Sequence, residues 1–274
     1  RDRAALHDAL ESHPVEAVIH FAALASVSES MTAPELYFEN NVQGTQNLLE
    51  AMRHKGVDKI VFSSTCATYG IPEEVPIAET TPQVPVNPYG ESKLMVEKML
   101  HWYGVCHDLK WAALRYFNVA GSDPDGELGE EHDPETHLIP LAIDAALGLR
   151  PPLHVFGDDY PTPDGTAIRD YIHVCDLVEA HGLALEKLCA GEPSFACNLG
   201  TGRGASVREV LEAVAEVVGK PVPHSIAPRR AGDPPALVAN AEKAGHILQW
   251  SPRYPALVDS VRHAWQRRRR GETS

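Results

Sequence analysis

Short apolar runs alternate along this chain with longer segments of helical periodicity, and this alternation restricts the possible folds more than any other feature. Runs rich in Val, Ile, Phe and Ala occupy residues 17–21, 59–63 and 111–116, with helical patterns between them at 34–54 and 88–103. Apolar strands separated by helices are typical of a parallel sheet that is covered on both faces. The first half therefore predicts an α/β fold with a Rossmann-type parallel sheet.

The regular alternation is interrupted after Asn118. Residues 121–134 are rich in Gly, Pro, Asp and Glu, and they sustain neither a helical nor a strand period. Beyond them we expect a smaller C-terminal α/β domain, with Ser206 as the N-cap of a helix that runs to Val218. Its other predicted elements are helices at 138–147, 176–189, 241–248 and 255–268 and strands at 153–156, 170–174 and 195–199.

The charge balance argues against nucleic acid and membranes as partners. The 274 residues include 38 acidic and 24 basic side chains, a formal net charge of −14, whereas both partners require a positive protein face. No apolar run approaches the roughly 20 residues of a membrane-spanning helix. The five cysteines are too few and too widely spaced for a disulfide framework or a CxxC metal site. We therefore expect a cytoplasmic protein that acts on small molecules, with the basic run Arg267–Arg270 as a frayed end.

Small and hydroxyl-bearing residues follow two of the predicted strands. The segment Phe21-Ala22-Ala23 ends the first strand, and Phe62-Ser63-Ser64-Thr65 ends the second. Ligands of open parallel sheets bind beyond the carboxyl ends of the strands, where small side chains let a flat ring or a ribose approach the backbone. The same residue types also occur in ordinary strand-to-loop turns, so this pattern alone does not identify a site.

Tyr89 and Lys93 have the spacing Tyr-x-x-x-Lys, which places both side chains on one face of a predicted helix. Pro88 suits the first helical position, so Tyr89 lies in the first turn, where the helix dipole favours an anion. With the Lys93 ammonium nearby, we expect the phenol pKa to fall from about 10 toward neutrality, as a general base requires. Thr65 is expected to bind the same substrate oxygen. The alternative is a surface pair beside a turn threonine.

Seven motifs occur in order along the chain: HFAA (20–23), NNVQGT (40–45), FSSTCATYG (62–70), NPYGESK (87–93), RYFN (115–118), DGTAIRDYIHV (164–174) and APRRAGD (227–233). Together they resemble the UDP-galactose (UDP-glucose) 4-epimerases, a family of extended short-chain dehydrogenases/reductases, and the resemblance covers essentially the whole chain. It implies a tightly held NAD, oxidation of UDP-galactose or UDP-glucose at C4, and return of the hydride to the opposite face of a 4-keto sugar. It also implies a homodimer.

The resemblance assigns roles to individual residues. Tyr89 would be the base, Lys93 would lower its pKa and bind the nicotinamide ribose, and Thr65 would lie beside the sugar. The implied NAD contacts are Phe21, Ala22, Ala23, Asn40, Ser63, Ser64, Tyr89, Lys93 and Tyr116. The implied nucleotide-sugar contacts are Thr65, Asn118, His137, Leu138, Phe156, Arg169, Tyr171, Arg230 and Asp233.

The chemistry of the distal residues agrees with this assignment. The guanidinium groups of Arg169 and Arg230 can bind a pyrophosphate bidentately, and Asp233 can accept a hydrogen bond from a ribose hydroxyl. No metal ligands are assigned. The implied domains are an NAD-binding Rossmann domain, residues 1–119, and a nucleotide-sugar-binding domain, residues 120–274, with some segments crossing back.

Two alternatives remain within enzymes of this type. Sugar-nucleotide 4,6-dehydratases resemble one another in an acidic pair directly after the threonine, but here Thr65 is followed by Cys66 and Ala67, which favours an epimerase. Leu237 is at the position that resembles the family's gate for N-acetylated sugars. Its size leaves UDP-N-acetylhexosamines open as substrates.

A non-catalytic alternative rests on a missing motif. No predicted strand leads into Gly-x-x-Gly-x-x-Gly or Gly-x-Gly-x-x-Gly, the turn that binds the dinucleotide pyrophosphate. Either the chain is a nucleotide-sugar-binding relic, or its first strands and Gly-rich turn precede Arg1. In the second case the full-length parent is the epimerase, and the printed chain neither retains NAD nor turns over. Joint retention of Tyr89, Lys93 and Thr65 favours the second.

Overall fold

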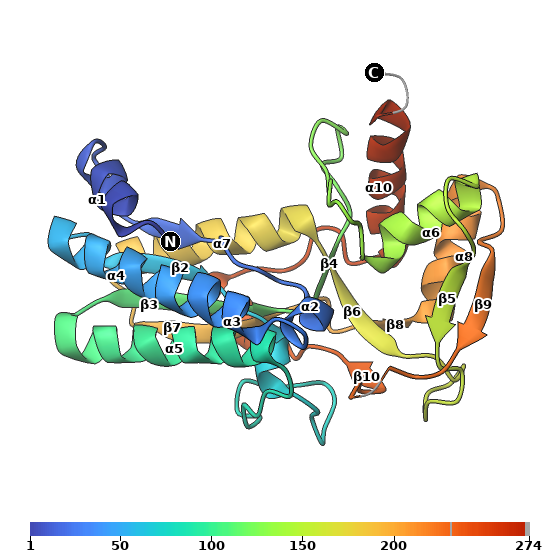
Figure 1. Ribbon diagram of the computed structural model, residues 1–274, viewed down its shortest axis with the longest axis horizontal. Helices are drawn as coiled ribbons and strands as arrows, with labels where there is room; N and C mark the ends of the chain where they lie inside the picture. Colours follow the sequence, from blue (N-terminus) through green and yellow to red (C-terminus); the bar gives the residue numbers. More distant parts are fainter. Residues whose placement is uncertain (231, 272–274) are drawn as a thin grey trace.

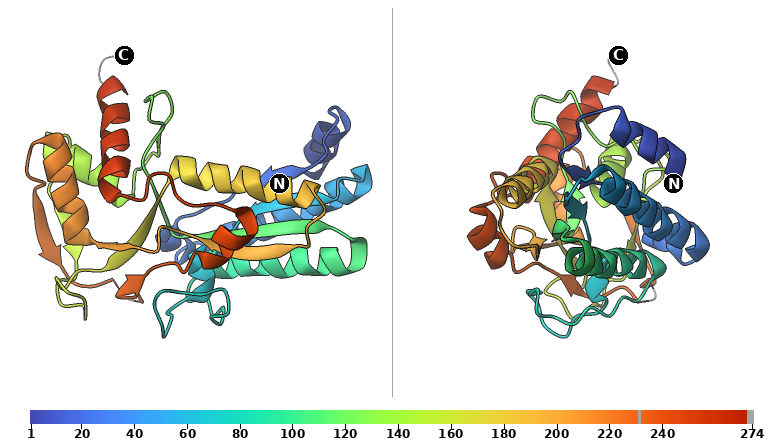
Figure 2. Two further views of the ribbon diagram at one scale, coloured as in Figure 1. Left: turned by 180° about the vertical axis from the view of Figure 1, so that it is seen from behind. Right: turned by 90° about the vertical axis from the view of Figure 1, so that its left-hand side faces the viewer.

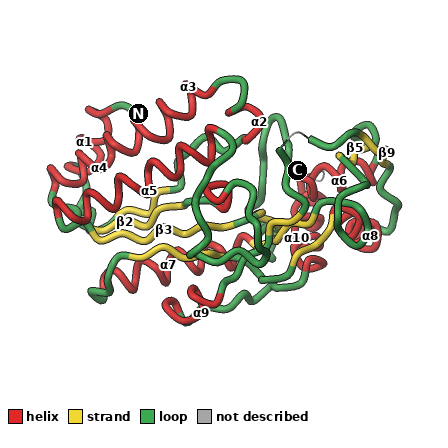
Figure 3. The backbone as a smooth tube through the Cα atoms, turned by 90° about the horizontal axis from the view of Figure 1, so that it is seen from below, coloured by secondary structure: helices red, strands yellow, loops and turns green. Residues whose placement is uncertain are grey.

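A four-stranded parallel sheet of order β1-β2-β3-β7 organises one end of the molecule. The computed structural model describes residues 1–230 and 232–271. Two helices, α4 and α5, cover one face of this sheet, and α7 covers the other (Figures 1 and 3). The predicted Rossmann-type fold class is thereby confirmed. The elements are β1 (Val18–His20), β2 (Lys59–Ser63), β3 (Lys110–Tyr116), β7 (Phe195–Leu199), α4 (Gly44–Lys55), α5 (Pro88–His107) and α7 (Val174–Cys189).

The remaining elements of this end lie around the sheet. The segment predicted as one helix at 34–54 is helical throughout, but it widens into a π-helix at Phe38–Gln43, a form often found at functional sites. Helix α1 was not predicted; its N-cap is Asp2, whose carboxylate accepts a hydrogen bond from Ala5 N at 3.1 Å. The bounds are α1 (Arg3–Glu11), α2 (Val27–Ser30), α3 (Pro34–Tyr37) and α9 (Glu242–Leu248).

The other end of the molecule holds two small sheets and three helices (Figure 2). One sheet has β6 at its centre, with β4, β8 and β10 beside it, and the other pairs β5 with β9. Ser206 caps α8 in a capping box with Glu209, as the sequence predicts for the cap. The bounds are β4 (Asn118–Ala120), β5 (Leu153–Phe156), β6 (Ile168–His173), β8 (Gly204–Ser206), β9 (His224–Ala227), β10 (Ala236–Leu237), α6 (Leu138–Leu147), α8 (Val207–Val218) and α10 (Leu257–Gly271).

The second half of the chain bears on the expected domain boundary and on the expected frayed basic end. The domain boundary after residue 119 stays a prediction, although α7 and β7, which follow it in sequence, belong to the first sheet. The expectation of a frayed basic end is wrong for the described residues, because α10 continues through Gly271. Its Arg267 forms an ion pair with Glu131, and Arg268 Nε lies 2.7 Å from Asp144 Oδ1. None of the described helices is both long and apolar enough to cross a membrane.

The start of α5 is fixed by local chemistry. Asn87 is the N-cap, since its side chain accepts a hydrogen bond from Gly90 N at 2.8 Å, and Pro88 takes the first helical position as expected. A side chain at position 90 would place its Cβ 2.5 Å from Ala67 O. Glycine therefore lets the first turn of α5 pack directly against the 3-10 turn Cys66–Tyr69 that follows β2.

A buried ion pair joins α5 to the sheet beneath this turn. Arg115 Nη2 on β3 lies 2.6 Å from Glu97 Oε2 on α5, and both side chains are almost fully buried. Glu97 also accepts a hydrogen bond from Ser64 Oγ at 2.5 Å, and Arg115 Nη1 donates to Tyr69 Oη at 2.9 Å. Tyr69 in turn donates to Asn198 Oδ1 on β7 at 2.7 Å. One network thus connects β2, β3, β7, α5 and the 3-10 turn.

The ion pair predicts a non-additive pair of substitutions. Glu97→Met leaves the Arg115 charge buried without its partner, so we expect the free energy of unfolding to fall by about 3–5 kcal/mol. The double variant Glu97→Met/Arg115→Met removes both charges and should recover most of that loss. Urea denaturation of the three proteins measures this difference. A double variant no more stable than Glu97→Met would contradict the assignment.

Candidate active site

Tyr89, Lys93 and Thr65 come together at the carboxyl end of β2, as the sequence predicts. Lys93 Nζ donates to Ser63 O at 2.8 Å and lies 6.0 Å from the centroid of the Tyr89 ring. The Thr65 side chain lies near the Tyr89 phenol and accepts a hydrogen bond from Ala67 N at 3.2 Å. Tyr89 is 8% exposed and Lys93 is 3% exposed. The three groups therefore form a closely packed, nearly dry cluster.

The expected lowering of the Tyr89 pKa is contradicted by this environment. Burial disfavours the phenolate and raises the pKa of Tyr89 above its ordinary value, and the nearby Thr65 side chain opposes this only in part. Burial likewise lowers the pKa of Lys93 to about 7. The helix dipole and the ammonium charge both favour the phenolate, but the cost of removing both side chains from water is larger.

The predicted residues after β1 lie at the same edge of the sheet. Phe21 is 49% exposed, and its ring centroid lies 4.5 Å from that of His181 on α7. Ala22 is exposed and Ala23 is half-buried. This combination presents an aromatic side and small side chains to a ligand that approaches the ends of β1 and β2.

The two predicted serines have different surroundings. Ser63 Oγ lies 2.6 Å from Tyr116 Oη, so these two predicted residues share a hydrogen bond beside Lys93. Ser64 is fully buried, and its hydroxyl donates to Glu97 in the ion-pair network. Its backbone N–H donates to Leu114 O at 2.9 Å, so Ser64 supports the fold through both its side chain and its backbone.

Asn41 is a residue that the sequence analysis missed. Its side chain accepts from Leu24 N at 2.8 Å and donates to Leu24 O at 3.0 Å and to Ser92 Oγ at 3.0 Å. It thereby fixes the segment after β1 to α5. The predicted residue Asn40 donates to Asn41 Oδ1 at 3.1 Å within the π-helix. The doubled asparagine was the available signal, but only the first was assigned.

A cavity of about 730 Å³ is lined by residues between Asn118 and Arg268. Its walls include eight of the nine predicted nucleotide-sugar residues; the ninth, Thr65, belongs to the Tyr89 cluster. The eight are Asn118, His137, Leu138, Phe156, Arg169, Tyr171, Arg230 and Asp233. Residues as far apart in the sequence as Asn118 and Asp233 therefore line the same cavity.

Arg169 and Asp233 were expected to bind a diphosphate and a ribose hydroxyl, but in the structure they bind each other. Arg169 Nη2 lies 2.5 Å from Asp233 Oδ1, so the guanidinium and the carboxylate bind each other. Arg169 Nη1 also donates to Ile168 O at 2.7 Å. The Arg230 guanidinium lies 4.1 Å from the centroid of the Phe156 ring, a cation–π contact. The cavity thus carries two fixed guanidinium groups and an aromatic face.

His137 is held by carboxylates at the rim of the cavity. Its Nδ1 lies 2.5 Å from Glu130 Oε1 and 2.9 Å from Glu135 Oε1. The hydrogen bond with Glu130, together with that to Glu135, raises the pKa of His137 to about 9. The resemblance assigned His137 to the nucleotide sugar, whereas its ring contacts neighbouring side chains of the chain itself.

The fold and the site together define a class of protein. A Rossmann-type parallel sheet with a buried Tyr-x-x-x-Lys pair and a threonine at its carboxyl edge is the arrangement of an extended short-chain dehydrogenase/reductase. The sequence profile of the NAD dependent epimerase/dehydratase family matches residues 1–200. The chain belongs to this family.

Individual relatives agree with the family match. The UDP-glucose 4-epimerase of Halalkalibacterium halodurans is 53% identical over 265 residues, which cover 97% of this chain and 79% of that protein. A crystal structure of UDP-glucose 4-epimerase from Brucella ovis in complex with NAD is 52% identical with a TM-score of 0.94, covering 96% of this chain and 81% of that one. The Bifidobacterium longum enzyme in complex with NAD⁺ and UDP is 39% identical, also with a TM-score of 0.94, over 99% and 81%. The predicted resemblance is confirmed.

The buried lysine predicts a pH dependence of stability. The pKa of Lys93 is about 7 in the folded protein and about 10.4 in an unfolded chain. Between these values the unfolded chain binds a proton that the folded protein does not, so the contribution of Lys93 to stability rises with pH. Lys93→Met removes this contribution. We expect the stability of the wild type relative to Lys93→Met to increase between about pH 7 and 9.5 in urea denaturation.

The matched control is Lys98→Met, which makes the same change on the exposed side of α5. Its stability should follow that of the wild type across the same pH range. Parallel curves for the wild type and Lys93→Met would show that Lys93 retains an ordinary pKa in the folded protein.

Proposed function

We propose that this chain acts as a UDP-glucose 4-epimerase, which interconverts UDP-galactose and UDP-glucose through a 4-keto intermediate with bound NAD. The observation that carries the proposal is the buried cluster of Tyr89, Lys93 and Thr65 beside a cavity that contains two guanidinium groups. Relatives described as UDP-glucose 4-epimerases, some solved with NAD and UDP, support the same substrate and cofactor.

The residues at the ends of β1 and β2 fit the nicotinamide ribose of NAD. An ammonium group has three hydrogen-bond donors, yet within the described residues Lys93 Nζ has one hydrogen-bond partner, Ser63 O. A buried donor without an acceptor is unfavourable, and the two hydroxyls of a ribose would supply the missing acceptors. Phe21 and the small side chains of Ala22 and Ala23 leave room for the ring.

Tyr89 moves the proton in this proposal. NAD, when bound, supplies a hydride acceptor for the sugar C4 and a positive charge. That charge offsets the burial that raises the pKa of Tyr89, which Lys93 alone does not do. Tyr89 Oη then takes the proton of the C4 hydroxyl and later returns it to the same oxygen. Thr65 hydrogen-bonds that oxygen and keeps it at the phenol.

The cavity holds the nucleotide rather than the reacting sugar. Arg230 and Arg169 bind the diphosphate, since the five donors of a guanidinium allow Arg169 to keep Asp233 as a second partner. A 4-keto sugar must turn its other face to the returning hydride, so it has to remain loosely held. Binding energy placed on the non-reacting nucleotide permits this.

The residue after Thr65 argues against a dehydratase, and the surroundings of Leu237 do not favour N-acetylated sugars. Removal of water by a dehydratase needs an acid next to Thr65, but the residue there is Cys66, whose burial raises the pKa of its thiol to about 12. Leu237 is half-buried on β10 and packs against the apolar cluster that contains Cys66 and Tyr69. This contact does not indicate that N-acetylated sugars are accepted as substrates.

The location and assembly of the protein are also proposals. We propose a cytoplasmic homodimer that forms through α5, because Met95, Trp102 and Val105 make an exposed apolar stripe along this helix. The family resemblance implies the same assembly. Sedimentation velocity of the full-length protein tests it, since a monomer at micromolar concentration would exclude this interface.

The function is tested by a matched pair of tyrosine variants. Tyr89→Phe removes the proposed base, and Tyr103→Phe makes the same change on α5 away from the site. In a coupled assay for UDP-glucose formation by the full-length protein, we expect Tyr89→Phe to lose about 10²–10⁴-fold in kcat. Tyr103→Phe should keep wild-type activity. Equal activity of Tyr89→Phe and wild type would remove Tyr89 as the base, and an inactive wild type that binds UDP would favour the non-catalytic alternative.

A further inference from the structure

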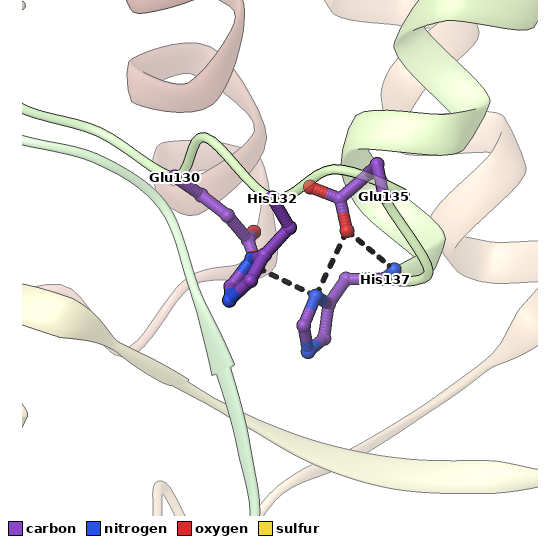
Figure 4. Close-up of side chains that lie close together, drawn as sticks. All are labelled: Glu130, His132, Glu135 and His137. Atoms are coloured by element: carbon purple, nitrogen blue, oxygen red, sulfur yellow. Dashed lines mark hydrogen bonds and ion pairs between the residues drawn. The ribbon is translucent and has the colours of Figure 1, made fainter. Parts of the chain in front are cut away.

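Two Glu-x-His pairs lie next to one another just before α6. Glu130 and His132 form the first pair, Glu135 and His137 form the second, and we call the four residues the Glu–His cluster. Figure 4 shows their side chains converging on one spot at the rim of the cavity. The expectation of no metal ligands rested on cysteine spacing alone. In the Glu-x-His spacing, both members of each pair can point to one side of an extended segment.

The distances within the cluster are those of a set of ligands that can share one ion. One ligand atom from each of the four side chains lies within 4.8 Å of every other. Glu130 Oε1 lies 2.9 Å from His132 Nδ1 and 2.5 Å from His137 Nδ1. Zinc bonds of about 2.0–2.2 Å to nitrogen and oxygen in a tetrahedron separate the ligand atoms by about 3.4 Å. Shifts of about an ångström or less in these side chains would thus admit the ion.

We propose that the Glu–His cluster binds one divalent transition-metal ion, and that Zn²⁺ suits its ligands best. Two imidazoles and two carboxylates are a nitrogen and oxygen set that zinc accepts. Mg²⁺ and Ca²⁺ prefer oxygen ligands alone, so the two histidines select against them.

The surroundings of the cluster hold its ligands in place. Glu135 Oε1 also accepts hydrogen bonds from Thr136 N at 2.6 Å and from His137 N at 2.7 Å, which fixes its carboxylate at the start of α6. Glu131, between the two members of the first pair, points to α10 and forms the ion pair with Arg267. The loop before α6 is therefore anchored on two sides, and Figure 2 shows it beside α10.

The exposure of the four side chains shows how an ion can reach the Glu–His cluster. The imidazoles of His132 and His137 are about half or more exposed, whereas the carboxylates of Glu130 and Glu135 are largely covered, so an ion enters from solvent past the two rings. Once bound, it would join the loop to α6 along one wall of the nucleotide-sugar cavity. The cluster contains neither Tyr89 nor Lys93, and zinc binding is measured without turnover, so its test and the test of the epimerase proposal can fail separately.

The test is Zn²⁺ binding to the purified wild type and to single variants by isothermal titration calorimetry. Loss of a residue that only supports a metal ligand weakens binding about 10–100-fold. We therefore expect His132→Ala and Glu130→Gln each to weaken Zn²⁺ binding at least about tenfold. Titration with Mg²⁺ should give no binding in the same concentration range. Circular dichroism confirms that each variant is folded.

The control addresses a second group of candidate ligands. His7, Glu11 and His54 also lie close together, on the outer side of α1 and α4. His54→Ala should bind Zn²⁺ as the wild type does. The proposal is overturned if His54→Ala abolishes the tight site, if His132→Ala and Glu130→Gln bind as the wild type, or if the wild type has no saturable site.

A structural readout complements the affinity. Hydrogen exchange measured by mass spectrometry should slow in the segment 122–137 when Zn²⁺ is added to the wild type, because the ion joins this loop to α6. The same segment should be unaffected by Zn²⁺ in His132→Ala. Protection that appears elsewhere, or equally in both proteins, would contradict the assigned ligands.

Discussion

The buried ion pair between Glu97 and Arg115 is the interaction on which the geometry of the site depends. It joins α5 to β3 directly beneath the turn that carries Thr65. A buried ion pair contributes little net stability, but it penalises any arrangement that separates its partners. The pair therefore fixes where the first turn of α5 lies relative to the end of β2. Gly90 then allows the close contact that brings Tyr89 to Thr65.

Much of the fold could be predicted from the sequence because its local patterns are strong. The strands at 59–63, 153–156 and 195–199 and the helix at 138–147 agree with the structure to the residue. Their boundaries coincide with apolar runs and, for the helix, with a glycine at its end. The short strands β8 and β10 were missed, because two or three residues carry no periodicity and their pairing with β6 is purely tertiary.

The site shows the same division between local and long-range information. Motifs placed Tyr89, Lys93 and Thr65 together, and in the structure all three are buried near the end of β2, with Lys93 Nζ 6.0 Å from the centroid of the Tyr89 ring. The direction of the Tyr89 pKa shift could not be obtained in this way, because it depends on burial by the whole fold. The pairing of Arg169 with Asp233 likewise joins positions 64 residues apart. The net charge of −14 does not prevent the cavity from binding an anion, because Arg169 and Arg230 place positive charge in the cavity itself.

The central claim is that hydrogen leaves the sugar C4 as a hydride and returns to the same carbon within one active site, while Tyr89 handles only the hydroxyl proton. The most direct measurement uses the full-length protein and UDP-galactose that carries deuterium at C4, in ordinary water. The account predicts that the UDP-glucose formed keeps its deuterium at C4 when it is analysed by NMR and mass spectrometry. Replacement of that deuterium by solvent hydrogen would mean that C4 loses a proton instead, and it would contradict the account.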